Sequence, residues 1–188
     1  MALDVNKGID VCERLLAEQT SEKKRRNLEL VIAHMRAEAR CDIKGVLATL
    51  CDKPRYVWHS EPDNPDLNPQ GSKQAVAGFY DRMVVQPGAH RLEWDITRVM
   101  VDDDAVLTEG VMKVAFPGKG LLEMGVNVDD PDAYYVAEGI TTVIWPVDPE
   151  SGLLVGEEVY EYDKMNGIED RKISLDEIVP LMEQASAG

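Results

Sequence analysis

Residues 42–80 read DIKGVLATLCDKPRYVWHSEPDNPDLNPQGSKQAVAGFY, and this stretch decides the fold. It predicts a short aromatic strand over residues 55–60, a proline-rich loop over 61–70, and then a helix capped by Ser72. The strand carries His59 and lies between two amphipathic helices, ahead of a run of longer strands. Such an order is a way to build a pocket.

Helical periodicity dominates the chain on both sides of this stretch. Over residues 27–41 apolar side chains recur at i, i+3, i+4 and i+7, which predicts one buried stripe. Shorter helices are predicted over 9–20 and 43–51, and the helix after Ser72 continues the same pattern to Met83. The first half of the chain is therefore expected to be mainly helical.

From residue 91 onward the apolar period changes to two, which is typical of half-buried strands. Strands are predicted over residues 91–101, 105–116, 134–147 and 153–163. Residues 117–133 are expected to form a long loop, and residues 174–185 a helical tail capped by Ser174, although Pro180 disturbs its pattern. Helices first and an antiparallel meander afterwards predict an α+β fold with helices on one face of a curved sheet.

Composition excludes several classes of function. The 188 residues carry a formal net charge of −15, which argues against nucleic acid and anionic membranes as partners. Three cysteines without a C-x-x-C pair and three widely spaced histidines indicate neither a disulfide framework nor a metal site. Nucleotide-binding glycine motifs are absent, so no cofactor is expected. The N-terminus lacks the pattern of a signal peptide, and we expect a cytoplasmic protein.

The order of elements resembles the nuclear transport factor 2-like superfamily, and within it the SnoaL-like (polyketide cyclase-like) group. The resemblance is carried by DIKGVL at 42–47, YVWH at 56–59, GSKQAV at 71–76 with the following Phe79-Tyr80, and GLLV at 152–155 leading into VYEYD at 159–163. It covers residues 27–163, with 1–26 as an N-terminal helical extension and 164–188 as a C-terminal helical tail. It implies a cone-shaped, cystatin-like α+β barrel, in which helices pack inside a curved, mainly antiparallel sheet around an apolar cavity. Many such proteins form homodimers through the outer sheet face.

The chemistries of this superfamily fit the chain unevenly. Ketosteroid isomerases resemble it in layout, but they place a base carboxylate near the position of His59 and a tyrosine near His34. Limonene-epoxide hydrolases use an Arg-x-Asp pair where this chain has Gly110-Val111-Met112. Scytalone dehydratases use two histidines, to which His90 bears only a slight resemblance. The SnoaL-like group fits the spacing best.

Three residues are candidate catalytic groups. If Val57 faces the core, His59 lies at the pocket mouth, where a pKa near neutral suits acid–base work. The alternative is a strand-end histidine bonded to the following loop. Glu138 and Glu109 lie among apolar neighbours on their strands, where burial would raise the pKa of a carboxyl. The alternative for both is an outer sheet face or a dimer interface.

Aromatic and long apolar side chains are the candidate ligand-binding residues. They are Tyr56, Trp58, Tyr80, Trp94 and Met112, together with Arg98, which shares a predicted strand face with Trp94 and could bind a carboxylate. Core packing is the alternative for the apolar members. Two functions follow: a cofactor-free lyase, isomerase or cyclase acting on a small hydrophobic carbonyl compound, or a non-catalytic dimeric module that binds a small molecule or a protein.

Overall fold

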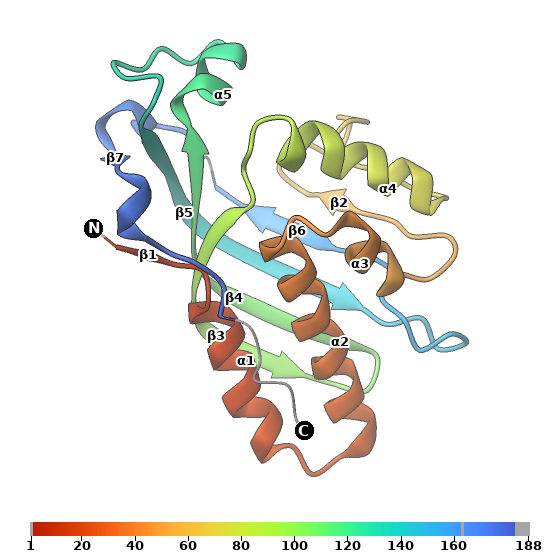
Figure 1. The fold of residues 1–188 in the computed structure, drawn as a ribbon. Coiled ribbons are helices and arrows are strands. Elements are labelled where there is room, and N and C mark those ends of the chain that lie inside the picture. Colours follow the sequence, from red (N-terminus) through yellow and green to blue (C-terminus); the bar gives the residue numbers. More distant parts are fainter. Residues whose placement is uncertain (1, 163, 183–188) are drawn as a thin grey trace.

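The computed structural model describes residues 2–162 and 164–182, and Figure 1 shows helices packed along one side of a curved sheet. The long elements are α1 (Lys7–Glu18), α2 (Glu22–Ala39), α4 (Lys73–Tyr80), β3 (Arg91–Val101), β4 (Ala105–Pro117) and β5 (Tyr134–Pro146). The shorter ones are β1 (Leu3–Asp4), α3 (Ile43–Ala48), β2 (Val57–Trp58), η1 (Asp81–Val85), α5 (Gly118–Glu123), β6 (Glu158–Glu161), η2 (Ile168–Asp170), β7 (Lys172–Ile173), η3 (Leu175–Glu177) and β8 (Ile178–Val179). The expected α+β architecture is confirmed.

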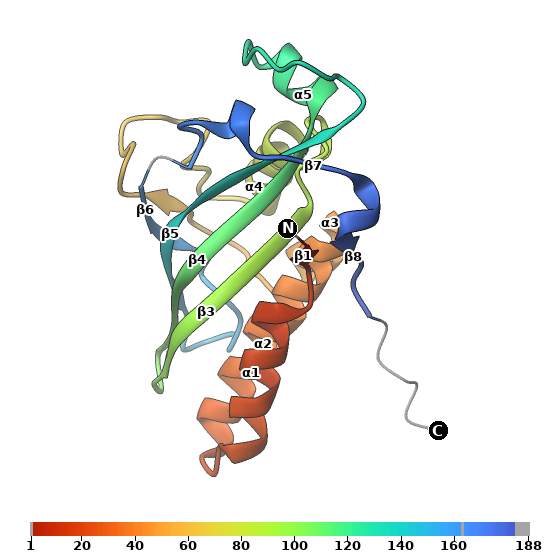
Figure 2. The same cartoon turned by 90° about the vertical axis from the view of Figure 1, so that its left-hand side faces the viewer.

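The main sheet has the strand order β2-β6-β5-β4-β3, and β7 pairs with β5. Neighbouring long strands are antiparallel, whereas β2 runs parallel to β6. Figure 2 shows the strong twist of β3, β4 and β5 and the position of α1 and α2 on one side of them. The predicted meander is therefore right for the long strands, and β2 closes the sheet at the edge beyond β6.

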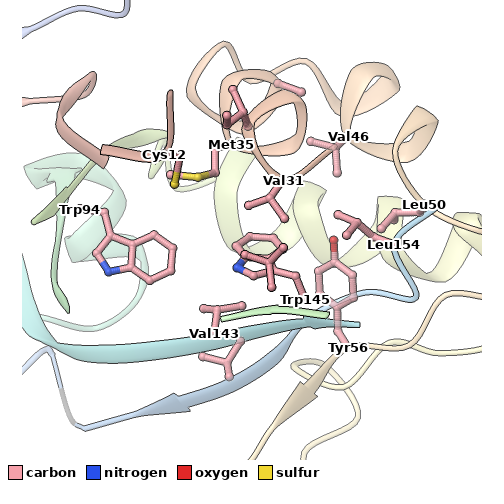
Figure 3. Close-up of a cluster of buried hydrophobic side chains, with 14 of the residues drawn as sticks. Cys12, Val31, Met35, Val46, Leu50, Tyr56, Trp94, Val143, Trp145 and Leu154 are labelled. Carbon is pink, nitrogen blue, oxygen red and sulfur yellow. The ribbon is translucent and has the colours of Figure 1, made fainter. Parts of the chain in front are cut away.

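Helix α2 forms the centre of the core, as its apolar stripe predicts. Ser21 caps it by accepting a hydrogen bond from the Lys24 backbone N–H. Its residues Leu28 and Val31 are fully buried, and burial of each such side chain contributes about 1.5–3 kcal/mol. Figure 3 shows Val31 above the Trp145 ring, which projects from the sheet. The predicted helix over 27–41 is confirmed and begins one turn earlier.

The β3–β4 hairpin contains an irregularity that its sequence pattern does not reveal. Ile96 pairs with Gly110 and Arg98 pairs with Glu109, so Thr97 is an extra residue, a β-bulge. The bulge reverses which side chains face inward, so Trp94 is buried whereas Met100 is 60% exposed. The prediction that Arg98 shares the face of Trp94 is therefore wrong.

The C-terminal segment differs from the predicted helix over 174–185. The 3-10 turn η3 is followed by β8, which pairs in parallel with β1 near the N-terminus. Pro180 explains the difference, because it has no N–H and cannot continue a helix. Residues 183–185 lie outside the described residues. The predicted loop over 117–133 also contains a short helix, α5.

Both predicted extensions pack onto the central body. Helix α1 contacts β3 so closely that a Cβ on Gly8 would lie 3.0 Å from Trp94 Cβ. Strands β1 and β8 join the two ends of the described chain. Among the described residues, the helices are too short or too polar to cross a membrane.

Candidate functional site

A cavity of about 840 Å³ lies between the helices and the inner face of the sheet. Most of its wall is apolar or aromatic, including Ile9, Met35, Trp58, Phe79, Trp94, Met112, Val143 and Trp145. The polar groups Glu38, Tyr80 and Glu157 also line it. A mainly apolar cavity with a few convergent polar groups is typical of small-molecule sites.

The hydroxyl of Tyr80 is the centre of this polar group. It donates to Glu38 Oε1 at 2.6 Å and lies 3.2 Å from Glu157 Oε1. It also lies 3.1 Å from His34 Nε2 and 3.1 Å from the Tyr56 hydroxyl. We call His34, Glu38, Tyr56, Tyr80 and Glu157 the Tyr80 cluster.

Local structure explains how five separate residues meet. His34 and Glu38 are four residues apart on α2 and therefore share a face. Tyr80 ends α4, and Tyr56 and Glu157 directly precede the paired strands β2 and β6. The His34 ring is fixed edge-on against Trp145, with ring centroids 5.4 Å apart. The cluster is thus held by two helices and by buried residues that directly precede two strands.

Burial sets the protonation of the cluster. It raises the pKa of Glu38 to about 7, with the neighbouring charge of Glu157 adding to the effect. The Glu38 side chain is 30% exposed and lines the cavity, so it can meet a ligand. Burial also raises the pKa of Tyr80 and Tyr56 well above the usual range, so both remain hydrogen-bond donors at neutral pH.

His34 is subject to opposing effects. Complete burial disfavours the charged imidazole, but the hydrogen bond with Glu157 and the charges of both carboxylates outweigh it and raise the pKa of His34. Its Nε2 lies 3.3 Å from Glu157 Oε1 and 3.8 Å from Glu38 Oε1. A carboxyl with a pKa near 7 in contact with an imidazole of raised pKa is suited to proton transfer.

The same atoms could be bridged by a divalent cation, since one ligand atom each of His34, Glu38 and Glu157 lies within 4.8 Å of the others. Tyr80 provides a different bridge, because its hydroxyl is within hydrogen-bond distance of all three. These contacts can pass protons between the members of the cluster.

The structure brings most of the predicted ligand-binding residues to the cavity. Trp58, Tyr80, Trp94 and Met112 line it, whereas Tyr56 is buried behind the wall as a member of the Tyr80 cluster. Their roles in binding stay predictions.

The predicted position of His59 at the pocket mouth is wrong. Trp58 faces the cavity, and alternation along the strand directs the next side chain to the opposite face. His59 is exposed and stacks on Tyr160, with ring centroids 4.0 Å apart.

Glu138, Glu109 and Arg98 also lie outside the cavity, so for both glutamates the alternative of an outer sheet face is the one that the structure shows. On β5 the cavity-facing residues include Ala137, Thr141 and Val143, so Glu138 points to the outer face. Glu109 forms an ion pair with Arg98 at 3.1 Å on that same face. Side chains alternate between the two faces along β4 and β5 as predicted, but the face expected to line the cavity is the outer face of the sheet.

The sequence does contain a signal for the missed residues. His34 and Glu38 interrupt the buried stripe of α2 with two polar side chains on one helical face. Polar groups on a face that must be buried require partners, which indicates a site. Glu157 carries no comparable signal, because its neighbour Glu158 is equally acidic and only the sheet decides which one points inward.

No protein-family model matches the chain, and no curated protein matches it. Solved structures do. A proposed SnoaL-like polyketide cyclase from Shewanella putrefaciens CN-32 superposes with a TM-score of 0.62 at 11% identity, covering 86% of this chain and 92% of that one. A nuclear transport factor 2-like protein of unknown function from Burkholderia pseudomallei K96243 gives a TM-score of 0.55 at 16% identity, covering 76% and 97%.

A third structure, TerC co-crystallised with polyporic acid, gives a TM-score of 0.51 at 12% identity and covers 78% of this chain and 97% of that one. At these identities the likeness concerns the fold. The chain therefore has the nuclear transport factor 2-like fold, in the form shared by SnoaL-like polyketide cyclase proteins.

Proposed function

We propose that this protein is an isomerase, cyclase or lyase that moves a proton on a small, hydrophobic carbonyl compound. The observation that carries the proposal is the Tyr80 cluster, which presents Glu38, Glu157 and Tyr80 to a mainly apolar cavity. A non-catalytic binding module is the other hypothesis. It gives no reason to bury two carboxylates and an imidazole together, since burial of such groups costs free energy.

In the proposed reaction Glu38 is the base. Its carboxylate removes a proton from the carbon next to the carbonyl, and the resulting enolate oxygen is stabilised by a hydrogen bond from a donor such as Tyr80. The protonated Glu38 then returns the proton at another carbon or to a departing oxygen. The proton balance closes within the site, so the side chains alone complete the cycle.

The charges of the cavity wall favour an uncharged substrate. Its two described cationic side chains are already paired, Arg82 with Asp66 at 3.3 Å and Lys164 with Glu161. His90 also lines the cavity, and burial together with Arg91 lowers its pKa, so it is neutral. An anionic ligand would therefore lack a free counterion.

The first test is proton exchange with the solvent. A ketone such as 2-tetralone is incubated with the protein in D2O, and loss of the signal of the protons next to the carbonyl is followed by NMR. We expect protein-dependent exchange that EDTA leaves unchanged. His59→Gln, Glu109→Gln and Glu138→Gln should exchange at the wild-type rate, because these residues lie outside the cavity. A large loss of ketone exchange in any of these variants would show that the reaction takes place on the outer face of the sheet.

We further propose that a second copy of the chain covers the outer face of the sheet. Met100, Ile140 and Tyr160 on this face are 60%, 56% and 45% exposed, and a second copy would remove these apolar side chains from water. Sedimentation equilibrium should show a dimer, strengthened by salt because the chains carry −15 each. Ile140→Glu should give a monomer, whereas Leu122→Glu on α5 should not. A monomeric wild type would contradict the proposal.

A further inference from the structure

The hydroxyl of Thr49 contacts His34 in a way that restricts where the imidazole carries its proton. Thr49 Oγ1 lies 2.6 Å from His34 Nδ1 and 2.7 Å from the Val46 carbonyl oxygen. A hydroxyl has one proton, and a carbonyl oxygen can only accept. Both hydrogen bonds exist together only when Thr49 donates to Val46 and His34 Nδ1–H donates to Thr49.

We propose that Thr49 is a positioning residue that holds the His34 proton on Nδ1. Nε2 is then the atom through which His34 exchanges a proton with the other members of the Tyr80 cluster. The arrangement is buried. His34 is 0% exposed, Thr49 is 7% exposed, and Thr49 ends α3, where its hydroxyl bonds back to the last turn. Neither ring nitrogen of His34 faces solvent.

The other side of the ring faces two carboxyl groups and two tyrosine hydroxyls. Besides Thr49, the groups around His34 are Glu38 on its own helix, Tyr80 from α4, and Tyr56 and Glu157 from the strand edge. Tyr80 makes its shortest bond to Glu38, at 2.6 Å. The Tyr80 proton is therefore not directed at the contact between His34 Nε2 and Glu157, which are 3.3 Å apart. This contact becomes a hydrogen bond when Nε2 is protonated.

The consequence for the reaction rests on the proposed function. With Nδ1–H fixed, a proton on Nε2 makes His34 an imidazolium that stabilises Glu157 and Glu38 as carboxylates. When Glu38 becomes protonated in the catalytic cycle, His34 can pass its Nε2 proton to the Glu157 carboxylate, 3.3 Å away, and recover it when Glu38 is again ionised. The tautomer itself does not depend on any reaction.

NMR of protein labelled with ¹⁵N in its histidines tests the tautomer directly. The three histidines are assigned with His59→Gln and His90→Gln, and spectra are recorded from pH 5 to 10. We expect the neutral form of His34 to carry its proton on Nδ1, the minor form of histidine in water. A proton on Nε2 in the neutral wild-type protein would overturn the proposal.

Variants of Thr49 then separate positioning from packing. Thr49→Val keeps the shape but removes the acceptor for Nδ1–H, so His34 should change to the Nε2–H form and its pKa should fall. Ketone exchange should slow by about ten-fold or more. Thr49→Ser should restore the Nδ1–H tautomer of His34 and the rate of ketone exchange. An unchanged tautomer in Thr49→Val would overturn the proposal, whereas the expected tautomers in a wild type without ketone exchange would refute only the proposed function.

Discussion

Glu38→Gln is expected to lower the rate constant of ketone exchange by about 10²- to 10⁴-fold, the usual contribution of a general base. Glutamine keeps the shape of the side chain and an oxygen that accepts from Tyr80, so the cavity should remain intact. It cannot take a proton. The loss should therefore appear in kcat, with KM nearly unchanged.

The pH dependence of the wild type supplies an independent readout of the same residue. Because the pKa of Glu38 is raised to about 7, exchange should increase with pH through the neutral range as the carboxylate forms. The raised pKa also means that folding favours the protonated form, so the stability linked to Glu38 is lost between about pH 4.5 and pH 7. Above pH 7 Glu38→Gln should consequently be more stable than the wild type, although its ketone exchange is slower.

This combination of lost activity and gained stability distinguishes a catalytic carboxylate from a structural one. Glu29→Gln is the matched control, since Glu29 lies on the same helix but its side chain is 52% exposed. It should change neither readout. Wild-type exchange by Glu38→Gln would show that Glu38 is not the base, and Glu157→Gln would then be the variant to lose activity.

The fold could be predicted from the sequence because its determinants are local. The apolar stripe of α2 specifies a helix and the face that it buries. The period-two pattern after residue 91 specifies strands whose side chains alternate between two faces. The prediction for the C-terminal tail is wrong, because a strand pairing between β1 and β8 takes the place of a helix. Such a pairing joins residues from opposite ends of the chain, which local sequence patterns do not reveal.

The site could be predicted only in part, because strand alternation gives two faces without saying which is inner. His59, Glu109 and Glu138 were assigned to the wrong side for this reason, and Arg98 was misplaced by the bulge at Thr97. Helical periodicity has no such ambiguity. His34 and Glu38 could have been found, since they lie on the apolar face of α2.

Gly110→Ala is expected to cause the largest loss of stability among the variants considered. Gly110 pairs with Ile96 at the bulge, and a Cβ there would lie 2.1 Å from the Asp95 carbonyl oxygen and 2.7 Å from Ile96 Cα. Both are backbone atoms, which cannot turn aside as a side chain would. We expect a loss of about 3 kcal/mol, the upper end for overpacking. The melting temperature should fall by about 6–12 °C, measurable by calorimetry.

Gly78→Ala is the matched control for this prediction. Gly78 lies within α4, and a Cβ there would meet only the flexible end of Arg82, at 3.3 Å. Alanine in a helix interior is favoured over glycine, so this variant should gain about 0.5–1 kcal/mol. If Gly110→Ala were as stable as the wild type, β3 and β4 could separate at the bulge without cost. The bulge would then not be what holds Trp94 inside the cavity and Arg98 outside it.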